Sequence, residues 1–456
     1  MTQPRRQLNL LDVICINVGI VIGAGIFEST PFIASNTSGP VYLIALWITG
    51  GVAALLGALC YAELTTTLPR HGGEYAFLSE AYGKNAGFLF AWADFWIIRP
   101  GNIGSMAFVF ANYFQQLCGI TPTIQTTLVC ALGSLAALTA TNLLGVQMGK
   151  WTQNLLTLTK LLGIAIIIVT GLLLLPAANV GGAVLEPPTP QSLSAHSLAM
   201  ILIMFSYGGW NEMSNVAAEM HNPRRTIVWG LVGSAVTVAA VYVLANIAFI
   251  RALGFNGMVH STAVATDVMA IRFGSPGRIL ISLLICVSSL GAMNGTLFTG
   301  PRIYYALGCD HGVFRWLGQW NVSLGVPARA LLLLSIVTAS MLAVFGVYPN
   351  GFSRLVEFTA PVFWGFFFFV SIAVFVLRRR PCETEPYRVP GGPIVPAIFC
   401  LMSAGMTYTG IRRAIEVRAW EAVWSVGILT IGLALVLYWW YRQAGKNGLP
   451  SKVRNL

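Results

Sequence analysis

Two hydrophobic stretches of this chain are interrupted near their middles by small residues. The first, residues 21–27, reads VIGAGIF, and the second, residues 205–210, reads FSYGGW. In hydrocarbon every backbone N–H and C=O group needs a hydrogen-bond partner, so an unwound span is tolerated only where the freed groups face protein, water or a ligand. Two such breaks, about half a chain apart, predict a transporter whose substrate binds exposed helix ends at the bilayer midplane.

The composition places the whole chain in a membrane. Hydrophobic residues make up 56% and charged residues only 9% of the 456 positions, whereas charged residues are about 25% of a soluble domain. A spanning helix needs about 20 mostly apolar residues. The twelve predicted spans lie near residues 10–35, 40–68, 85–116, 124–143, 151–176, 195–220, 226–250, 277–306, 328–347, 352–378, 393–412 and 420–441. The stretches 177–194 and 251–276 are predicted to be the longest segments outside the spans.

The distribution of Lys and Arg predicts the orientation. With Arg5 and Arg6 on the cytoplasmic side, eighteen Lys and Arg residues fall on that side and seven on the other, as the positive-inside rule favours. The cluster formed by Arg412, Arg413 and Arg418 fits this assignment worst. We therefore expect a multi-pass protein of the cell (plasma or inner) membrane with both termini cytoplasmic. The net charge of +11 follows from this bias, so no nucleic-acid partner is expected.

The two interrupted spans also suggest an internal repeat. Spans one to five, about 10–176, and spans six to ten, about 195–378, each begin with a Gly-interrupted helix and run in opposite directions through the membrane. This is the pattern of an inverted repeat. The predicted fold class is therefore an all-α membrane protein with one transmembrane domain, 1–456, and two extra helices at about 393–441.

The first break offers backbone groups for both charges of an amino acid. If the span unwinds there, Ala24, Gly25 and Ile26 begin a half-helix, whose free N–H groups and positive dipole end favour a carboxylate. The carbonyls near Val21 would accept from an ammonium group, and residues 205–209 supply the same pair of features. The alternative is that the small residues only permit close helix packing.

Several motifs identify a family that the chain resembles. The GAGIF motif of residues 23–27 resembles the first-helix motif of the amino acid–polyamine–organocation (APC) superfamily. Residues 61–64 (YAEL), Pro69, 72–75 (GGEY) and 82–83 (YG) are similar to that superfamily as well. Resemblance to its L-type (light-chain) amino-acid transporter branch is carried by Arg99-Pro100, residues 110–113 (FANY), 205–211 (FSYGGWN) and 294–299 (NGTLFT).

This resemblance implies a twelve-helix, LeuT-like fold with a 5+5 inverted repeat, moving amino acids by alternating access. It implies that the N–H groups of Ala24 and Gly25 hold the substrate carboxylate. The carbonyls of Val21, Phe205 and Gly208 would hold the amino group, and Phe205 would close over the substrate from outside as a gate. The full set of expected substrate-binding residues is Val21, Ala24, Gly25, Ile26, Phe205, Ser206, Gly208 and Gly209.

Lys160 matches the lysine that the family carries in span five, and its position has an independent argument. A lysine at the centre of a span is costly unless it is paired or faces a polar cavity. Its ammonium would take the place that sodium fills in sodium-coupled relatives, bridging span one to spans five and eight. Ser288 and Ser289 are expected to assist. Whether this ammonium is static or gains and loses a proton during transport stays open.

Glu28 departs from the family pattern, which has an apolar residue at this position. On a helix it shares the face of Ala24, one turn toward the outside. One interpretation is a site for protons or for a cationic substrate group, and the other is a carboxylate in the outer vestibule or at the half-helix N-terminus.

Other side chains give weaker expectations. Asp94 and Arg99 lie five residues apart in span three, so on an α-helix they do not share a face and no mutual ion pair is expected. Around the second break, Tyr207 and Trp210 are expected to form apolar walls beside Gly208 and Gly209, which favours a neutral, bulky amino acid.

Cofactors and partners are not indicated by the sequence. The scattered cysteines and the five histidines form no metal motif and no nucleophile–base cluster, so neither a metal cofactor nor an enzyme is expected. Cys118 lies near the position where eukaryotic relatives bond a heavy chain, but a short, stand-alone permease without that partner is expected.

The prediction is a sodium-independent amino-acid transporter that exchanges neutral amino acids in contact with membrane lipid. The alternatives are a proton-coupled amino-acid symporter and a cationic amino-acid or polyamine exchanger. A channel would need a repeated polar filter, and no such motif is present in the sequence.

Overall fold

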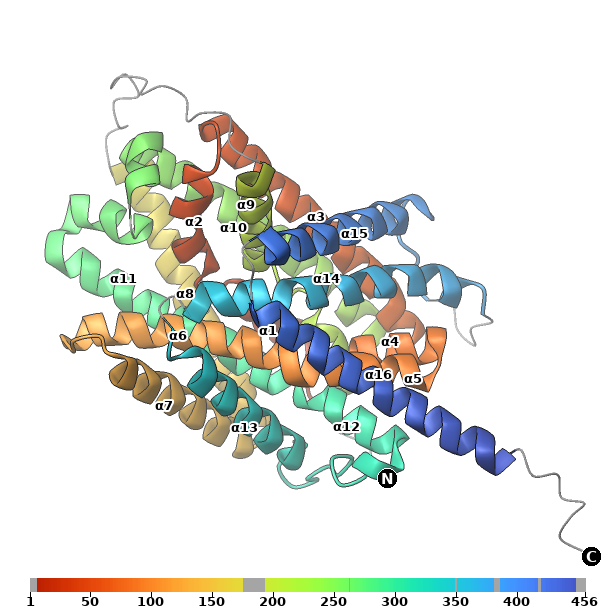
Figure 1. Ribbon diagram of the computed structural model, residues 1–456. Helices are drawn as coiled ribbons and strands as arrows, with labels where there is room; N and C mark the ends of the chain where they lie inside the picture. Colours follow the sequence, from red (N-terminus) through yellow and green to blue (C-terminus); the bar gives the residue numbers. More distant parts are fainter. Residues whose placement is uncertain are drawn as a thin grey trace, which may run out of the picture.

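The computed structural model describes residues 6–174, 193–261, 263–348, 351–380, 386–416 and 420–447. These residues form helices joined by short turns, and the β-structure among them is limited to two isolated bridges, Leu8 with Met220 and Asn321 with Val326. Figure 1 shows the resulting helical bundle.

The helices follow one another along the chain in this order: α1 (Leu10–Val21), α2 (Gly25–Ser35), α3 (Pro40–Thr67), α4 (Gly73–Tyr82), α5 (Lys84–Ala93), the π-helix η1 (Asp94–Ile98), α6 (Arg99–Cys118), α7 (Ile124–Leu143), α8 (Val146–Val169), the π-helix η2 (Thr170–Leu174), α9 (Leu193–Ser206), the 3₁₀-helix η3 (Glu212–Glu219), α10 (Pro223–His260), α11 (Val264–Thr299), α12 (Pro301–Asp310), the 3₁₀-helix η4 (Gly312–Phe314), α13 (Ala328–Phe345), α14 (Gly351–Arg378), α15 (Ile394–Glu416) and α16 (Trp420–Asn447).

Helical elements cover each of the predicted spans, but not always as one continuous helix. Within the described residues, eight helices are long and apolar enough to cross a membrane, and α1 with α2 adds a ninth if the bent pair is one span. Span three is built from α5, η1 and α6, and span six from α9, the break and η3. The all-helical, membrane-spanning fold class is therefore confirmed.

The segment 251–276, expected to lie outside the spans, is largely helical. α10 continues to His260 and α11 already begins at Val264. Each helix kinks once in this segment, at Gly254 (φ 70°) and at Gly274 (φ 58°). Glycine adopts a positive φ without steric cost, so the chain changes direction there while most of the segment stays helical. Most of the other expected loop, 177–194, lies outside the described residues.

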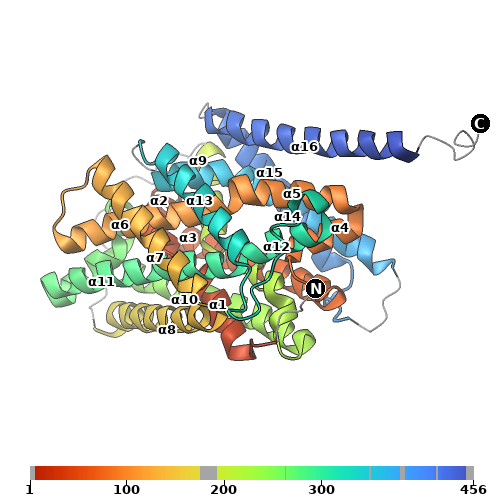
Figure 2. The same cartoon turned by 90° about the horizontal axis from the view of Figure 1, so that it is seen from below.

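The two broken elements lie inside the bundle. α1 packs against α8, α10 and α11, while α2 packs against α9 and α10. At the opposite edge, α16 runs along the outside of the bundle, far from α8 (Figure 2), and its contacts are mainly with α5. The breaks are thus enclosed by helices on several sides.

The N-terminal segment closes one end of the second broken element. The N–H groups of Gln7 and Leu8 donate to the carbonyl of Glu219 at 2.8 and 3.0 Å, and the N–H of His221 donates to the Leu8 carbonyl at 2.9 Å. The Glu219 carboxylate binds buried Arg302, with Nε to Oε1 at 2.9 Å.

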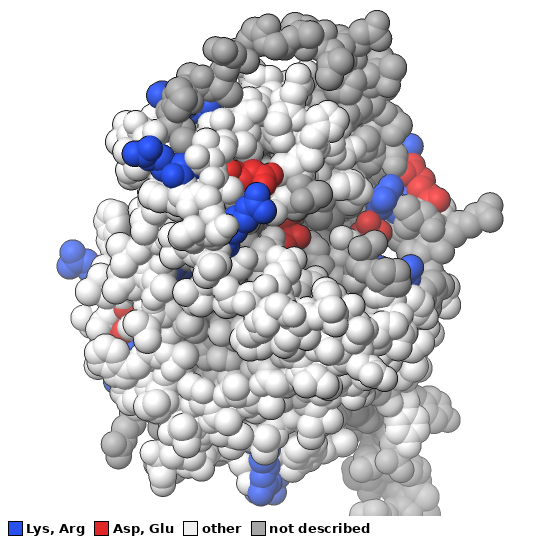
Figure 3. Space-filling view, turned by 90° about the vertical axis from the view of Figure 1, so that its left-hand side faces the viewer, with Lys and Arg blue, Asp and Glu red and all other residues white. Residues whose placement is uncertain are grey.

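Charges are sparse on the protein surface near the α6–α7 turn. In the face drawn in Figure 3, most atoms belong to uncharged residues, and Lys, Arg, Asp and Glu gather in a few separate patches. Among the described residues, the exposed large hydrophobic side chains are numerous and include Leu155, Leu158 and Leu162 along α8. Such a surface fits a hydrocarbon environment rather than water.

Close packing of α3 against the second break gives a first prediction. A Cβ atom added at Gly57 would lie 2.4 Å from two ring atoms of Trp210, whereas one added at Gly233 in α10 meets nothing within 4 Å. We expect Gly57→Ala to lower the free energy of unfolding by about 1–3 kcal/mol through overpacking. Gly233→Ala should leave it unchanged or raise it slightly. Thermal unfolding in detergent measures both, and equal midpoints for the two variants would contradict this packing.

Candidate functional site

The first break lies between α1 and α2, which meet at an angle of 43°. α1 ends at Val21 and α2 begins at Gly25, and the N–H of Gly23 turns back to the Val21 carbonyl at 2.7 Å. Across the described chain, no acceptor is found for the N–H groups of Ala24, Gly25 and Ile26. The break therefore leaves three donors at the positive end of a helix dipole.

The second break follows α9, which ends at Ser206. The N–H of Gly208 donates to the Phe205 carbonyl at 2.9 Å, and Gly209 has φ 103°, which favours glycine. The chain then enters η3 at Glu212. Both breaks thus occur where the sequence predicted them.

The two breaks pack directly on each other. A Cβ atom on Gly25 would lie 2.8 Å from Oγ of Ser206, and one on Gly209 would lie 2.6 Å from Cγ2 of Ile20. The glycines are required here for close approach of the two broken helices. The small residues therefore permit close helix packing and also leave backbone groups free, the two roles that the sequence left as alternatives.

A residue that the sequence analysis missed joins the two breaks. Tyr242 of α10 is fully buried, and its hydroxyl lies 2.9 Å from the Val21 carbonyl and 3.0 Å from the Ser206 carbonyl. These carbonyls end the two helices that precede the breaks. The signal in the sequence is a single tyrosine in a span without charged residues, which alone does not reveal its partners.

A cavity of about 70 Å³ lies between the breaks. Six of the expected substrate-binding residues line it: Val21, Gly25, Phe205, Ser206, Gly208 and Gly209. Ala24 and Ile26 do not line it, and their side chains are buried. Other lining residues come from α6, α9, α11, α14 and η3.

The residues that form the apolar walls of the cavity are not the ones predicted from the sequence. Tyr207 points away from the cavity and donates to the Trp47 carbonyl at 2.9 Å. Trp210 packs on Tyr61 and Phe367 instead, and neither residue lines the cavity. The turn at residues 207–210 directs both rings outward into helix packing. The apolar walls are formed by Ile201, Met106, Phe363 and Trp364, and the small volume does not support the expectation of a bulky substrate.

Phe205 lies at the cavity surface in a half-buried position. Its ring meets Phe352 of α14 edge to face, with centroids 5.7 Å apart. Phe352 contacts one side of the Phe205 ring, and the other side of that ring faces the cavity.

Lys160 of α8 ties three helices together. Its Nζ donates to the carbonyls of Gly19 and Ile22 at 2.7 Å each and to the Ser288 carbonyl at 3.1 Å. The Ser288 hydroxyl also donates to the Ile22 carbonyl at 3.0 Å. The hydroxyl of Ser289 is buried and has no partner among the described residues. The ammonium thus satisfies carbonyls that the end of α1 leaves free.

Glu28 lies on α2, beside the cavity but not lining it. Its carboxyl lies near the hydroxyl of Tyr113 of α6. In the described part of the chain, no Lys or Arg forms an ion pair with it.

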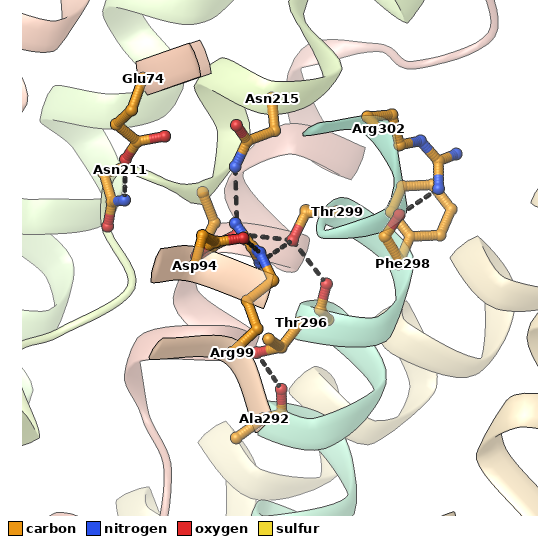
Figure 4. Close-up of polar contacts among 12 residues, drawn as sticks. Glu74, Asp94, Arg99, Asn211, Asn215, Ala292, Thr296, Phe298, Thr299 and Arg302 are labelled. Atoms are coloured by element: carbon orange, nitrogen blue, oxygen red, sulfur yellow. Dashed lines mark hydrogen bonds and ion pairs between the residues drawn. The ribbon is translucent and has the colours of Figure 1, made fainter. Parts of the chain in front are cut away.

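Asp94 and Arg99 form a buried ion pair, which corrects the expectation from the sequence. Arg99 Nε lies 2.9 Å from Asp94 Oδ2, and both side chains are only 3% exposed. The reason is the π-helix η1, which begins at Asp94. In a π-helix the i→i+5 spacing places residues five apart on the same face. Figure 4 shows the two side chains pointing toward each other.

Arg99 also reaches the second break. Its Nη1 lies 2.8 Å from Oε2 of Glu212, the first residue of η3 and one of the residues that line the cavity. Thr299 of α11 donates to the same oxygen at 2.6 Å, and Asn215 lies 3.3 Å from it. Figure 4 shows Asn215 and Thr299 converging on this point beside Arg99. The sequence analysis did not select Glu212.

Comparisons with known proteins agree with this geometry. The family described as amino acid permease matches residues 8–435. The b(0,+)-type amino acid transporter 1 of Mus musculus is 30% identical over 452 residues, which cover 97% of this chain and 90% of the relative. The serine/threonine exchanger of Bacillus subtilis (strain 168) is 29% identical, with 86% and 88% covered. The large neutral amino acids transporter small subunit 2 of Homo sapiens is 29% identical, with 95% and 79% covered.

The contacts of Lys160 generate a prediction about stability. Lys160→Met keeps a long side chain but removes the donor to three buried carbonyls. We expect the free energy of unfolding to fall by about 1–3 kcal/mol, the cost of leaving buried polar groups unpaired. Lys84→Met, at an exposed position, is the control. Thermal unfolding in detergent is the measurement, and a Lys160→Met midpoint equal to that of the control would contradict the role of these contacts.

Proposed function

The chain belongs to the amino acid permease family, and we propose that it carries a neutral amino acid across the membrane by alternating access, as a sodium-independent exchanger. Its relatives are amino-acid transporters that match nearly the whole chain. One of these relatives is named an exchanger of serine and threonine, and another a transporter of large neutral amino acids.

The observation that carries the proposal is the pair of breaks that face one cavity. The free N–H groups of Ala24, Gly25 and Ile26 bind the substrate carboxylate at the start of α2. The carbonyls of Val21, Phe205 and Gly208 bind the ammonium group. The Phe205 carbonyl has one partner and can accept a second, and the Val21 carbonyl can accept when the Tyr242 hydroxyl donates to Ser206 instead. The α-carbon groups are thus held by backbone atoms alone. Phe205 closes the cavity as the gate.

Lys160 supports sodium independence. Its ammonium fills the space between the carbonyls of α1 and α11, where a cation bound by backbone oxygens would otherwise be held. A fixed positive charge at that point repels a sodium ion.

Proton-coupled symport is the second candidate. The observation that favours it is the position of Glu28 inside the helical bundle on α2, near Tyr113, because a carboxyl inside a membrane protein is frequently part of a proton relay. An exchanger of cationic amino acids would use the same carboxyl to bind a positive substrate group.

The proposed architecture is a single domain, 1–456, of twelve membrane helices with a LeuT-like inverted repeat. Its halves are residues 10–176 and 195–378, each starting with a broken helix, and α15 and α16 lie outside them. We place the chain in the cell membrane with both termini cytoplasmic. It works without a heavy chain, although one relative is named a small subunit; Cys118, at the end of α6, is exposed.

Backbone recognition of both charges predicts which analogues bind. Amino acids should raise the melting temperature of the purified protein, because ligand that binds only the folded state stabilises it. The matching amide, the N-acetyl derivative and the decarboxylated amine should not, since each lacks one charge. A thermal-shift screen measures this. Stabilisation by the amine equal to that by the amino acid would overturn the proposed site.

The mode of transport has its own test in proteoliposomes that contain only this chain. We expect uptake of labelled amino acid to require unlabelled amino acid inside and to be unchanged when choline replaces sodium outside. Uptake into empty vesicles driven by an acidic exterior would instead indicate proton symport. Loss of uptake without sodium would contradict the role given to Lys160.

A further inference from the structure

We propose that Glu212 recognises the side chain of the substrate, and that the cavity therefore selects amino acids with a short side chain that ends in a hydrogen-bond donor. This inference rests on the proposed function and names the substrate class of the same site. The donor is a hydroxyl or an ammonium group, and both chemistries bind a carboxylate.

The two oxygens of Glu212 have different surroundings. Oε2 accepts from Arg99 at 2.8 Å, Thr299 at 2.6 Å and Asn215 at 3.3 Å. Oε1 has no hydrogen-bond partner among the residues that the structure describes, although Glu212 is only 7% exposed. Since Glu212 lines the cavity, Oε1 is the acceptor that it offers to a molecule inside. Oε1 is accessible rather than sealed in the interior, so a substrate donor can reach it and form a charge-assisted hydrogen bond.

The carboxylate is held in a fixed orientation. Arg99, which binds Oε2, is itself bound by Asp94 at 2.9 Å, and the Tyr304 hydroxyl donates to the same Asp94 oxygen at 2.9 Å. These contacts come from η1, α6 and α12, and Figure 4 shows Asp94 and Arg99 among them. A polar group that is positioned before binding loses little entropy when the ligand arrives.

The charges in this cluster do not balance. Asp94 and Glu212 are two carboxylates, and Arg99 is the only Lys or Arg in contact with either of them within the described residues. Glu74 lies on the other side of η3, where it accepts from Asn211 and from Tyr61 at 3.2 Å. The cluster therefore carries an excess of negative charge next to the cavity, which favours a donor and disfavours an acidic side chain.

The position of Glu212 fits contact with a side chain rather than with the α-carbon groups. Its N–H donates to the Gly209 carbonyl at 3.1 Å. Glu212 therefore lies one helical turn beyond the glycine of the break. A substrate held at the break has its side chain in the rest of the same cavity, whose whole volume is about 70 Å³. That volume suits a short chain, and Asn102, Thr296 and Thr359 add polar groups to the lining.

The test compares substrates of equal shape. In proteoliposomes, threonine, valine, serine, alanine and 2,3-diaminopropionate compete for uptake of a labelled amino acid. For the native chain we expect threonine to bind at least about tenfold more tightly than valine, and serine more tightly than alanine, the range of a hydrogen bond to a charged group. Diaminopropionate distinguishes a preference for an ammonium group from a preference for a hydroxyl. Tighter binding of serine or of diaminopropionate than of alanine supports the proposal.

Two variants separate recognition from stability. Glu212→Gln and Asp94→Asn each remove one negative charge from Arg99, but only Glu212 lines the cavity. We expect Glu212→Gln to reduce the threonine/valine ratio several-fold and Asp94→Asn, which loosens Arg99, to reduce it less. The control is Glu219→Gln, which removes a buried carboxylate of the same helix that pairs with Arg302 and does not line the cavity; it should leave the ratio unchanged. If the native chain binds threonine no more tightly than valine and diaminopropionate no more tightly than alanine, the inference is overturned without any variant, and the proposed function stays intact if these amino acids are carried. Failure of every amino acid to bind overturns both.

Discussion

Everything at the centre of this structure depends on the unmet hydrogen-bonding capacity of the peptide groups where α1 and α9 stop. In a low-dielectric interior an unpaired peptide group costs several kcal/mol, so it needs a hydrogen-bond partner in the protein, in water or in a ligand. Part of that capacity is met by the protein, because Lys160 binds carbonyls of α1 and Tyr242 binds carbonyls of both broken helices. The N–H groups at the start of α2 have no acceptor in the described chain, so they are the groups that a ligand can use.

The parts of this centre that were predicted from the sequence are those set by residue type and local spacing. Small residues at 23–25 and 208–209 indicate where the helices break, because larger residues do not permit such close backbone approach. A lysine within a span must find oxygen partners, so the contacts of Lys160 with α1 and Ser288 could be expected. The family resemblance added which of these groups are expected to bind the substrate carboxylate and which its amino group.

What could not be predicted depends on changes of helical type and on long-range packing. The Asp94–Arg99 pair exists because five residues of span three adopt π-helical geometry, and α-helical periodicity gave the wrong face. The rings of Tyr207 and Trp210 leave the cavity because the turn after α9 directs them toward α3, α10 and α14. Glu212 was not selected for a similar reason: its role depends on partners that come from α6 and α11.

The hydroxyl of Tyr242 has a mechanical consequence. A hydroxyl carries one hydrogen, so the carbonyls of Val21 and Ser206 share a single donor, and Gly25 presses against Ser206 at the same point. The two discontinuous helices are thereby coupled to each other through α10. A movement that separates the two helices must break one of the hydrogen bonds to this hydroxyl, whereas a movement that carries them together with α10 keeps both bonds.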